Sequence, residues 1–173
     1  MPSLFKSLEE SALSGELILQ EGGILQYHYQ KKHPGVVTIY IILVLPEYQG
    51  KGVGTSMLEE LKSRPEVNEI RAAVEADAPA NEWYKRQGFV TVVSRVTKSG
   101  KLLNIWVWRR DGEVPEVSPL RQARLTRGMT LEDVSKATGV DISTLSAIER
   151  GQYPLFPDTR DALKTFFGPG VVE

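Results

Sequence analysis

The 173-residue chain contains no cysteine, which excludes disulfide bonds, thiolate metal sites and a cysteine nucleophile. Long apolar runs are also absent. The most hydrophobic stretch, residues 36–46, is much shorter than the roughly 20 residues that a membrane helix needs. The first ten residues include acids and lack the apolar segment of a signal peptide. These absences predict a soluble, cytoplasmic protein that makes no membrane contact.

An excess of one charge sign is lacking as well. The formal net charge is −1, which argues against a strongly basic nucleic-acid binder. Residues 113–173 carry seven Lys and Arg against nine Asp and Glu, so that part has a charge of −2 and the rest has +1. His28 and His33 have no carboxylate at ligand spacing, so we predict no metal site.

Hydrophobic periodicity outlines an α/β region followed by short helices. Helical spacing predicts a helix over residues 4–13, and alternation predicts a hairpin of strands at 16–20 and 24–30. The β-branched run at 36–44 predicts a central strand buried on both faces. The later elements expected are a helix from Val53, strands over 69–76, 89–97 and 102–109, a helix over 80–87, and helices between 120 and 168.

A glycine-rich loop separates the central strand from the next helix. Gly50, Gly52 and Gly54 lack Cβ atoms, so an anion can approach the backbone closely. The first N–H groups of the following helix have no partner within it and favour a phosphate. The glycine spacing fits neither the dinucleotide fingerprint nor the P-loop. The simpler alternative is a tight turn before an ordinary helix, with Tyr84 and Phe89 as core aromatics.

Two segments carry a family resemblance. Gln49-Gly50-Lys51-Gly52-Val53-Gly54 matches (Gln/Arg)-x-x-Gly-x-(Gly/Ala), and residues 79–89 are similar to Pro-Ala-Asn-x-x-Tyr-x-x-x-Gly-Phe. In this order, over about residues 14–109, the chain resembles the GNAT N-acetyltransferases. The resemblance implies an α/β fold with a mixed, splayed central sheet and flanking helices, and acetyl-CoA as the cosubstrate. The family's usual pair of N-terminal helices is reduced here to one.

The resemblance also implies roles for individual residues. The pantetheine arm would pair with the central strand, and the pyrophosphate would meet the N–H groups of the loop. Asn81 would bind near the thioester, and Tyr84 would protonate the departing thiolate as a general acid. The expected cofactor-binding set is Ile42, Leu43, Val44, Gln49, Gly50, Lys51, Gly52, Val53, Gly54, Thr55, Asn81 and Tyr84.

The general base is less evident from the sequence. Many relatives place a Glu in the central strand, where this chain has Tyr40-Ile41-Ile42. Glu75 and Asp77, at the end of the next strand, are the candidate replacements, and we take Glu75 as the catalytic base. Tyr40 and His28 are weaker candidates, and positioning and solvent alone are a further alternative. Tyr84 favours an enzyme acting on an amine of a protein, peptide or small molecule. The missing Glu favours a regulator that uses the domain as an acyl-CoA sensor.

A second pattern occupies the C-terminal part of the chain. Residues 129–151 resemble the phage-repressor (Cro/C1, XRE-type) helix-turn-helix, including the Ile-Glu-Arg-Gly ending. Thr130 is expected as an N-cap with Asp133 at the capping-box position, and Gly139 suits the turn. By analogy the second helix of the pair would enter the major groove of DNA. The expected DNA contacts are Thr130, Ser143, Thr144, Ser146 and Arg150.

The use of this helical module stays open at the level of sequence. Arg121, Arg124 and Arg127 form either a local basic face or an ordinary solvated one. DNA binding competes with dimerisation or protein recognition, and a homodimer is expected by analogy with both families. We predict three segments: a GNAT-like domain at 1–111, a linker at 112–118 and a helix-turn-helix domain at 119–173.

Overall fold

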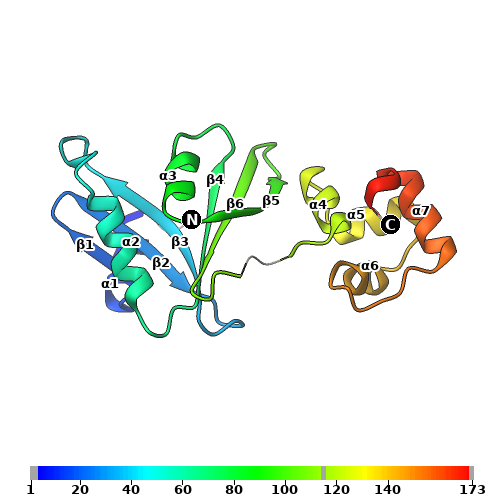
Figure 1. Ribbon diagram of the computed structural model, residues 1–173, viewed down its shortest axis with the longest axis horizontal. Helices are drawn as coiled ribbons and strands as arrows, with labels where there is room; N and C mark the ends of the chain where they lie inside the picture. The colour runs from blue at the N-terminus through cyan, green and yellow to red at the C-terminus, as the bar shows by residue number, and fades with distance from the viewer. Residues whose placement is uncertain (1–3, 114–115, 172–173) are drawn as a thin grey trace. The chain divides into compact units, whose positions relative to one another are not determined.

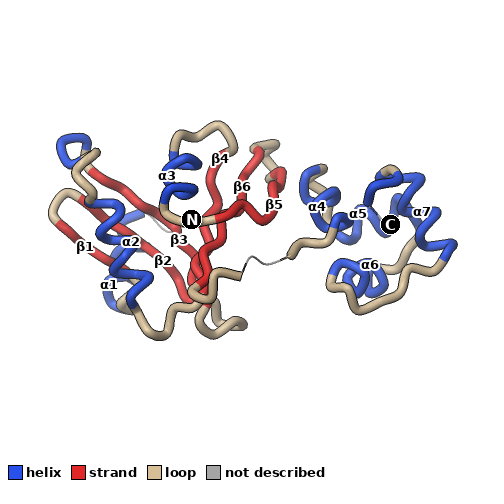
Figure 2. The backbone as a smooth tube through the Cα atoms, viewed as in Figure 1, coloured by secondary structure: helices blue, strands red, loops and turns tan. Residues whose placement is uncertain are grey.

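The computed structural model describes residues 4–113 and 116–171 (Figures 1 and 2). Six strands form one sheet in the order β1-β2-β3-β4-β6-β5, with both antiparallel and parallel pairs. The described residues divide into two compact units, one built from residues up to 73, 82–90 and 106–113, and the other from 74–81, 91–105 and 116–171. The predicted fold class, a mixed sheet with flanking helices and a following all-α region, is confirmed.

The elements agree with the predicted ones to within one or two residues at most ends. The short 3-10 helix η1 was not predicted. The N-terminal elements are α1 (Leu4–Leu13), β1 (Leu17–Gln20), β2 (Gly23–Tyr29), β3 (Val36–Val44), η1 (Pro46–Tyr48) and α2 (Val53–Ser63). They are followed by β4 (Glu69–Glu75), α3 (Ala80–Arg86), β5 (Val90–Val96) and β6 (Leu102–Arg109). The C-terminal helices are α4 (Pro119–Thr126), α5 (Leu131–Thr138), α6 (Ile142–Glu149), α7 (Pro157–Phe167) and the 3-10 helix η2 (Pro169–Val171).

Helices α1 and α2 cover opposite faces of the sheet at β2. Met57 of α2 packs against Gly23 of β2 and is fully buried. Gln26 points to the other face, where its amide donates to the Ser11 hydroxyl of α1 at 2.8 Å. Because successive strand residues alternate between faces, β2 presents Gly23, Leu25 and Tyr27 to α2 and Gln26 to α1.

Strand β3 separates from β4 partway along its length. It pairs with β2 up to Val44, but its parallel pairing with β4 covers only Val36 to Thr38. A β-bulge lies just past this point, because Tyr27 pairs with Ile39 whereas Gln26 pairs with Ile41, so that Tyr40 is the extra residue. The backbone edge of β3 beyond Thr38 is therefore unpaired on the β4 side.

The predicted burial of β3 on both faces is wrong for its second half. Val37 and Ile39 are buried, but the side chains of Tyr40 and Leu43 are 67% and 53% exposed. The strand loses its β4 neighbour after Thr38, and the bulge turns Tyr40 outward. A continuous β-branched run does not by itself report how many neighbours a strand keeps along its length.

The C-terminal helices pack around their own core. Its buried members are Leu120, Val134, Leu145, Ile148, Leu163 and Phe167. The predicted capping box is confirmed, since Thr130 and Asp133 exchange their side-chain and backbone hydrogen bonds at the start of α5. Gly139 ends α5 with φ of 74°, a left-handed conformation that glycine adopts without strain. In the part of the chain that the structure describes, no helix has the length and apolar character needed to cross a membrane.

Candidate functional site

The loop between β3 and α2 exposes a row of backbone N–H groups. Gly50 and Gly52 have φ of 73° and 84°, and no other atom lies within 4 Å of where their Cβ atoms would be. The first backbone hydrogen bond of α2 is donated by the Ser56 N–H to the Gly52 carbonyl, at 2.8 Å. Among the described backbone hydrogen bonds, none is donated by residues 52–55. The helix start therefore offers unpaired donors and its positive dipole end to an anion.

Two glycines of the β1–β2 hairpin hold this loop in place. A Cβ at Gly22 would lie 2.2 Å from the Tyr48 ring, and a Cβ at Gly23 would lie 2.6 Å from Val53. Tyr48 is anchored further by its hydroxyl, which donates to Glu21 at 2.8 Å and whose pKa this hydrogen bond raises. Tyr48 and Val53, at the two ends of the glycine loop, thus pack directly against the backbone of Gly22 and Gly23.

The expected pantetheine strand is accessible but not fully free. Ile42 and Val44 are half-buried and Leu43 is exposed, all in the part of β3 that has no β4 partner. The Gln49 side chain donates to the Val44 carbonyl at 3.1 Å, and Lys51 lies over the Tyr48 ring. A ligand amide that pairs with Val44 would share its carbonyl with Gln49.

Tyr84 lies in an aromatic cluster on α3. Its ring makes edge contacts with Trp83 and Phe89 and stacks on Trp106, and its side chain is buried. Tyr84 and Phe89 are both buried, as the simpler alternative for this segment expected, and this packing does not test the predicted catalytic role of Tyr84. Burial raises the pKa of the Tyr84 hydroxyl, so it stays protonated at neutral pH. No hydrogen bond to that hydroxyl is present among the described residues, so it is free to donate to a ligand.

Two other expected site residues are engaged within the protein. The Asn81 amide donates to the carbonyls of Glu75 and Ala78 at 2.7 and 2.8 Å and accepts from Asn104, which fixes the β4–α3 loop. The Glu75 carboxylate forms an exposed ion pair with Lys101 and raises the pKa of that lysine. A carboxylate that already binds Lys101 has to break that contact to accept a proton from an amine, which makes Glu75 a poorer candidate.

The expected DNA contacts of the helical region lie at the two helix starts and the end of α6. Thr130 uses its hydroxyl in the capping box, and Ser143 is exposed in the first turn of α6. Thr144 is half-buried. The Ser146 hydroxyl accepts from Arg150 at 2.6 Å. Of these residues, Thr130, Ser143 and Arg150 are exposed.

The arginines of α4 do not form the basic face that we considered. Arg124 makes a two-point ion pair with Glu149 of α6, at 2.6 and 2.9 Å, and both side chains are nearly buried. Arg127 donates to the carbonyls of Phe166 and Phe167 and stacks on the latter ring. Arg121 alone of the three is exposed without such a partner in the described structure. Neither a basic nor a solvated face is the right interpretation for Arg124, whereas Arg127 is exposed and also donates to two carbonyls.

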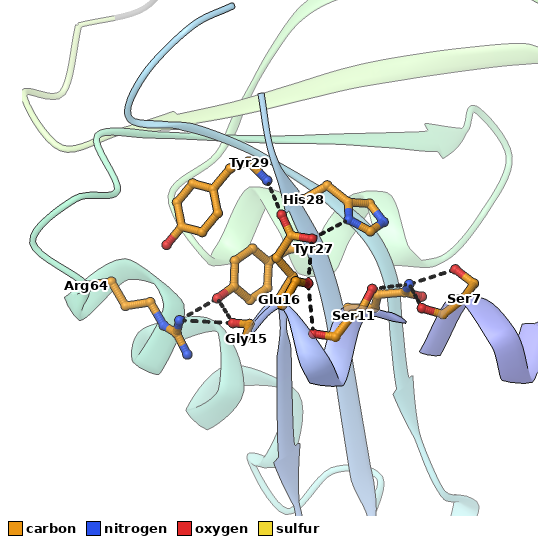
Figure 3. A network of polar contacts seen from close by, with 10 residues as sticks. Ser7, Ser11, Gly15, Glu16, Tyr27, His28, Tyr29 and Arg64 are labelled. Atoms are coloured by element: carbon orange, nitrogen blue, oxygen red, sulfur yellow. Dashed lines mark hydrogen bonds and ion pairs between the residues drawn. The ribbon is translucent and has the colours of Figure 1, made fainter. Parts of the chain in front are cut away.

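Sequence reasoning missed the polar contacts that hold α1 and α2 to β2 (Figure 3). Gln26 binds Ser7 and Ser11 of α1, while Tyr27 donates to Gly15 O at 2.8 Å and accepts from Arg64 at the end of α2. No motif marks these residues. Their alternation on β2 was the only available signal. Among the described residues, no three His, Asp or Glu side chains gather as metal ligands would.

Comparisons with known proteins agree with these two parts of the chain. Residues 10–91 match the family model described as "Acetyltransferase (GNAT) domain", and residues 119–163 match that described as "Helix-turn-helix domain". The NatB acetyltransferase complex bound to CoA and MES is similar to this chain with a TM-score of 0.54 and 12% identity, covering 63% of this chain and 84% of that one. No curated protein sequence gives a significant match.

Other solved structures give lower scores. The ribosomal-protein-S18-alanine N-acetyltransferase from Escherichia coli is 21% identical, with a TM-score of 0.49, and the alignment covers 63% of this chain and 78% of that one. A GNAT-family structure from Desulfovibrio desulfuricans is 22% identical, with a TM-score of 0.45, and covers 51% and 61%. This chain thus spans about three fifths of the length of the Desulfovibrio protein.

The splayed sheet with a glycine loop at a helix start defines an acyltransferase-type α/β fold, joined to a helix-turn-helix region. The family matches make this specific: residues 10–91 match a GNAT acetyltransferase domain, and residues 119–163 match a helix-turn-helix domain.

Proposed function

We propose that the GNAT domain binds acetyl-CoA and transfers its acetyl group to a primary amine. The observation that carries this proposal is the row of unpaired N–H groups at residues 52–55, next to the unpaired edge of β3. A diphosphate would accept from those donors, and the pantetheine amides would pair with the β3 backbone at Ile42 to Val44. The residues present therefore fit a coenzyme A thioester.

Tyr84 is proposed as the proton donor to the departing thiolate. Its hydroxyl has no acceptor in the described protein and stays protonated because burial raises its pKa. A phenol is a weaker acid than a thiol, so Tyr84 stabilises the thiolate mainly by a strong hydrogen bond and solvent completes the proton transfer. Asn81 would hold the loop under the thioester rather than bind it through its already engaged amide.

Acetyl transfer to a panel of primary amines, followed by mass spectrometry, tests this function. We expect Tyr84→Phe to lower kcat about 100-fold, the scale of general acid catalysis, with less than a twofold change in the Kd for acetyl-CoA. Tyr153→Phe, in the helix-turn-helix domain, is the matched control and should leave transfer unchanged. Tight acetyl-CoA binding with no transfer by wild type would instead favour the alternative, a regulator with an acyl-CoA sensor.

A second proposal concerns the helix-turn-helix domain, which we expect to bind DNA through α6. It rests on the family match and on the exposed positions of Ser143 and Arg150. With Arg124 and Arg127 engaged internally, few cations are left for phosphates, so affinity should be low and salt dependence shallow. Fluorescence anisotropy with random duplex DNA at low salt tests this. Dimers without DNA retention would support assembly as the domain's role.

A further inference from the structure

We infer that His28 is the general base that deprotonates the acceptor amine and that Glu16 is its positioning residue. This inference rests on the proposed acetyl transfer and supplies the base that the β3 strand lacks. It is carried by the position of His28 at the point where β3 and β4 separate, and by a carboxylate that fixes the orientation of its ring.

The register of the sheet places His28 one strand away from the proposed thioester site. His28 on β2 pairs with Thr38, which is the last residue of β3 that pairs with β4. The bulged Tyr40 lies just beyond, and its ring makes an edge contact with the imidazole at 5.6 Å between centroids. The thioester is proposed to lie in the gap that opens after Thr38, and His28 lies one strand away from that gap, across β3 at the level of its closed end.

Glu16 is held rigidly against one side of the imidazole (Figure 3). One carboxylate oxygen accepts from the Tyr29 backbone N–H at 2.9 Å, and the other accepts from the Ser14 hydroxyl and lies 3.0 Å from His28 Nδ1. Burial alone would raise the pKa of Glu16, but these hydrogen bonds outweigh it and hold the pKa below its ordinary value. Glu16 is thus an ionised acceptor.

An ionised acceptor fixes the tautomer of the ring. Glu16 has no proton to donate, so Nδ1 of His28 must carry the hydrogen, and in the neutral imidazole the lone pair is then on Nε2. The His28 side chain is 42% exposed, whereas that of Glu16 is 19% exposed. In the neutral ring Nε2 is the nitrogen that can act as the base, and the Glu16 carboxylate at Nδ1 would stabilise the imidazolium. Thr38 and Gln30, which bond to each other at 3.0 Å, supply the neighbouring polar surface.

The proton and bond changes balance without another reagent. His28 Nε2 takes a proton from the incoming ammonium group and becomes an imidazolium beside Glu16. The neutral nitrogen attacks the thioester carbonyl, forming the C–N bond, and the C–S bond then breaks to release the thiolate. The new amide nitrogen loses its second proton to solvent, and the thiolate takes up one proton from solvent while Tyr84 hydrogen-bonds to it, so these two transfers cancel. His28 returns its proton to solvent, so each turnover releases one proton overall.

The test combines kinetics with a readout that needs no acceptor. With the primary amine that the wild-type protein acetylates fastest, His28→Gln should lower kcat/KM about 100-fold at pH 7, with acetyl-CoA affinity changed less than twofold. Glu16→Gln should lower it about tenfold. Both defects should shrink as the pH approaches the amine's own pKa, because the amine then arrives neutral. His33→Gln in the β2–β3 turn is the matched control. A defect independent of pH, or none, would overturn the inference.

The tautomer of His28 is the second measurement. Long-range nitrogen–proton NMR correlations on the full chain should show hydrogen on Nδ1 in the wild-type protein, and a mixture of tautomers in Glu16→Gln. Hydrogen on Nε2 in the wild type would overturn the assignment of the base whether or not transfer is observed. Failure of the proposed function has a different signature, namely that neither wild type nor any variant acetylates an amine while the Nδ1 tautomer is intact.

Discussion

In the sequence, the glycine loop and the α4 arginines both indicated anion binding. In the structure, the donor groups of the loop have no protein partner, whereas two of the arginines do. At residues 52–55 the donors are backbone N–H groups that stay unpaired and accessible. In α4, the guanidinium group of Arg124 turns inward to a carboxylate, and that of Arg127, the C-cap residue, donates to carbonyls. Glycine spacing and a helix start fix backbone donors locally, whereas a long side chain has enough reach for tertiary neighbours to decide its partner.

The largest expected effect comes from removing the inward arginine. Arg124→Leu leaves the Glu149 carboxylate, whose side chain is 7% exposed, without its partner. We expect a loss of about 3 kcal/mol in the stability of the helical domain, the usual scale for breaking a buried pair. Native-state hydrogen exchange of α4 and α6 in the full chain measures it.

Arg121→Leu is the control for that substitution. Arg121 lies on the exposed side of the same helix, so its loss should change stability by no more than about 0.5 kcal/mol. Equal hydrogen-exchange protection factors in Arg124→Leu and Arg121→Leu would mean that the Arg124 side chain is as solvated as that of Arg121. The structural difference between the glycine loop and α4 would then not hold.

The second effect concerns the outward donors of the loop. Gly52→Ala puts a Cβ on a residue with φ of 84°, which costs roughly 1–2 kcal/mol, and we expect a roughly tenfold weaker acetyl-CoA Kd. Gly100→Ala has a matching φ of 82° and open space around its Cβ in the β5–β6 turn. It should lower stability similarly without changing affinity. Calorimetry distinguishes the two, and equal affinities would argue against the loop as the binding site.

The Thr130 capping box tests whether the start of α5 is stabilised by its own hydrogen bonds or by packing in the helical domain. Thr130→Ala removes the hydroxyl that accepts from the Asp133 N–H at 3.1 Å and should cost about 1 kcal/mol. Thr130→Ser keeps that oxygen and should recover most of the loss. Hydrogen exchange at the start of α5 measures both, and no rescue by serine would show that the threonine acts through packing instead.

The smallest expected effect is a change in the free energy of unfolding as the pH becomes acidic. The folded-state pKa of Glu16 lies below its ordinary value of 4.5, so its contribution to stability is present above 4.5 and is lost as pH falls through the folded value. Glu16→Gln should therefore show a shallower loss of stability below pH 4.5 than wild type. Urea unfolding at several pH values, followed by tryptophan fluorescence, measures the slope. Glu9→Gln, on α1, should keep the wild-type slope.

The parts of this molecule that could be predicted from sequence are those that local chemistry determines. The order of strands and helices, the glycine loop and the Thr130 capping box follow from periodicity, from glycine's left-handed conformations and from cap chemistry. The bulge at Tyr40, the end of β4 pairing at Thr38 and the Glu16–His28 contact could not be predicted. They depend on which strand residues come to face each other, and no short motif encodes that register.

The roles of the predicted site residues illustrate the same limit. Gly50 and Gly52 have open space around the position of a Cβ atom, whereas Tyr84 is buried in its aromatic cluster and makes no hydrogen bond through its hydroxyl among the described residues. Asn81 and Glu75 have the expected sequence positions, but Asn104, Lys101 and nearby carbonyls already engage them. A motif specifies where a residue lies along the chain, and the structure decides what else competes for its polar atoms.

Amide NMR during titration with acetyl-CoA tests the central claim most directly. We predict saturable shifts of the backbone N–H resonances of residues 50 and 52–55, with competition by coenzyme A and with smaller shifts at the α4–α7 amides. If acetyl-CoA left the resonances of residues 50–55 unmoved at saturating concentration, the diphosphate would not lie at the start of α2, and the proposed acetyl transfer would lose its structural basis.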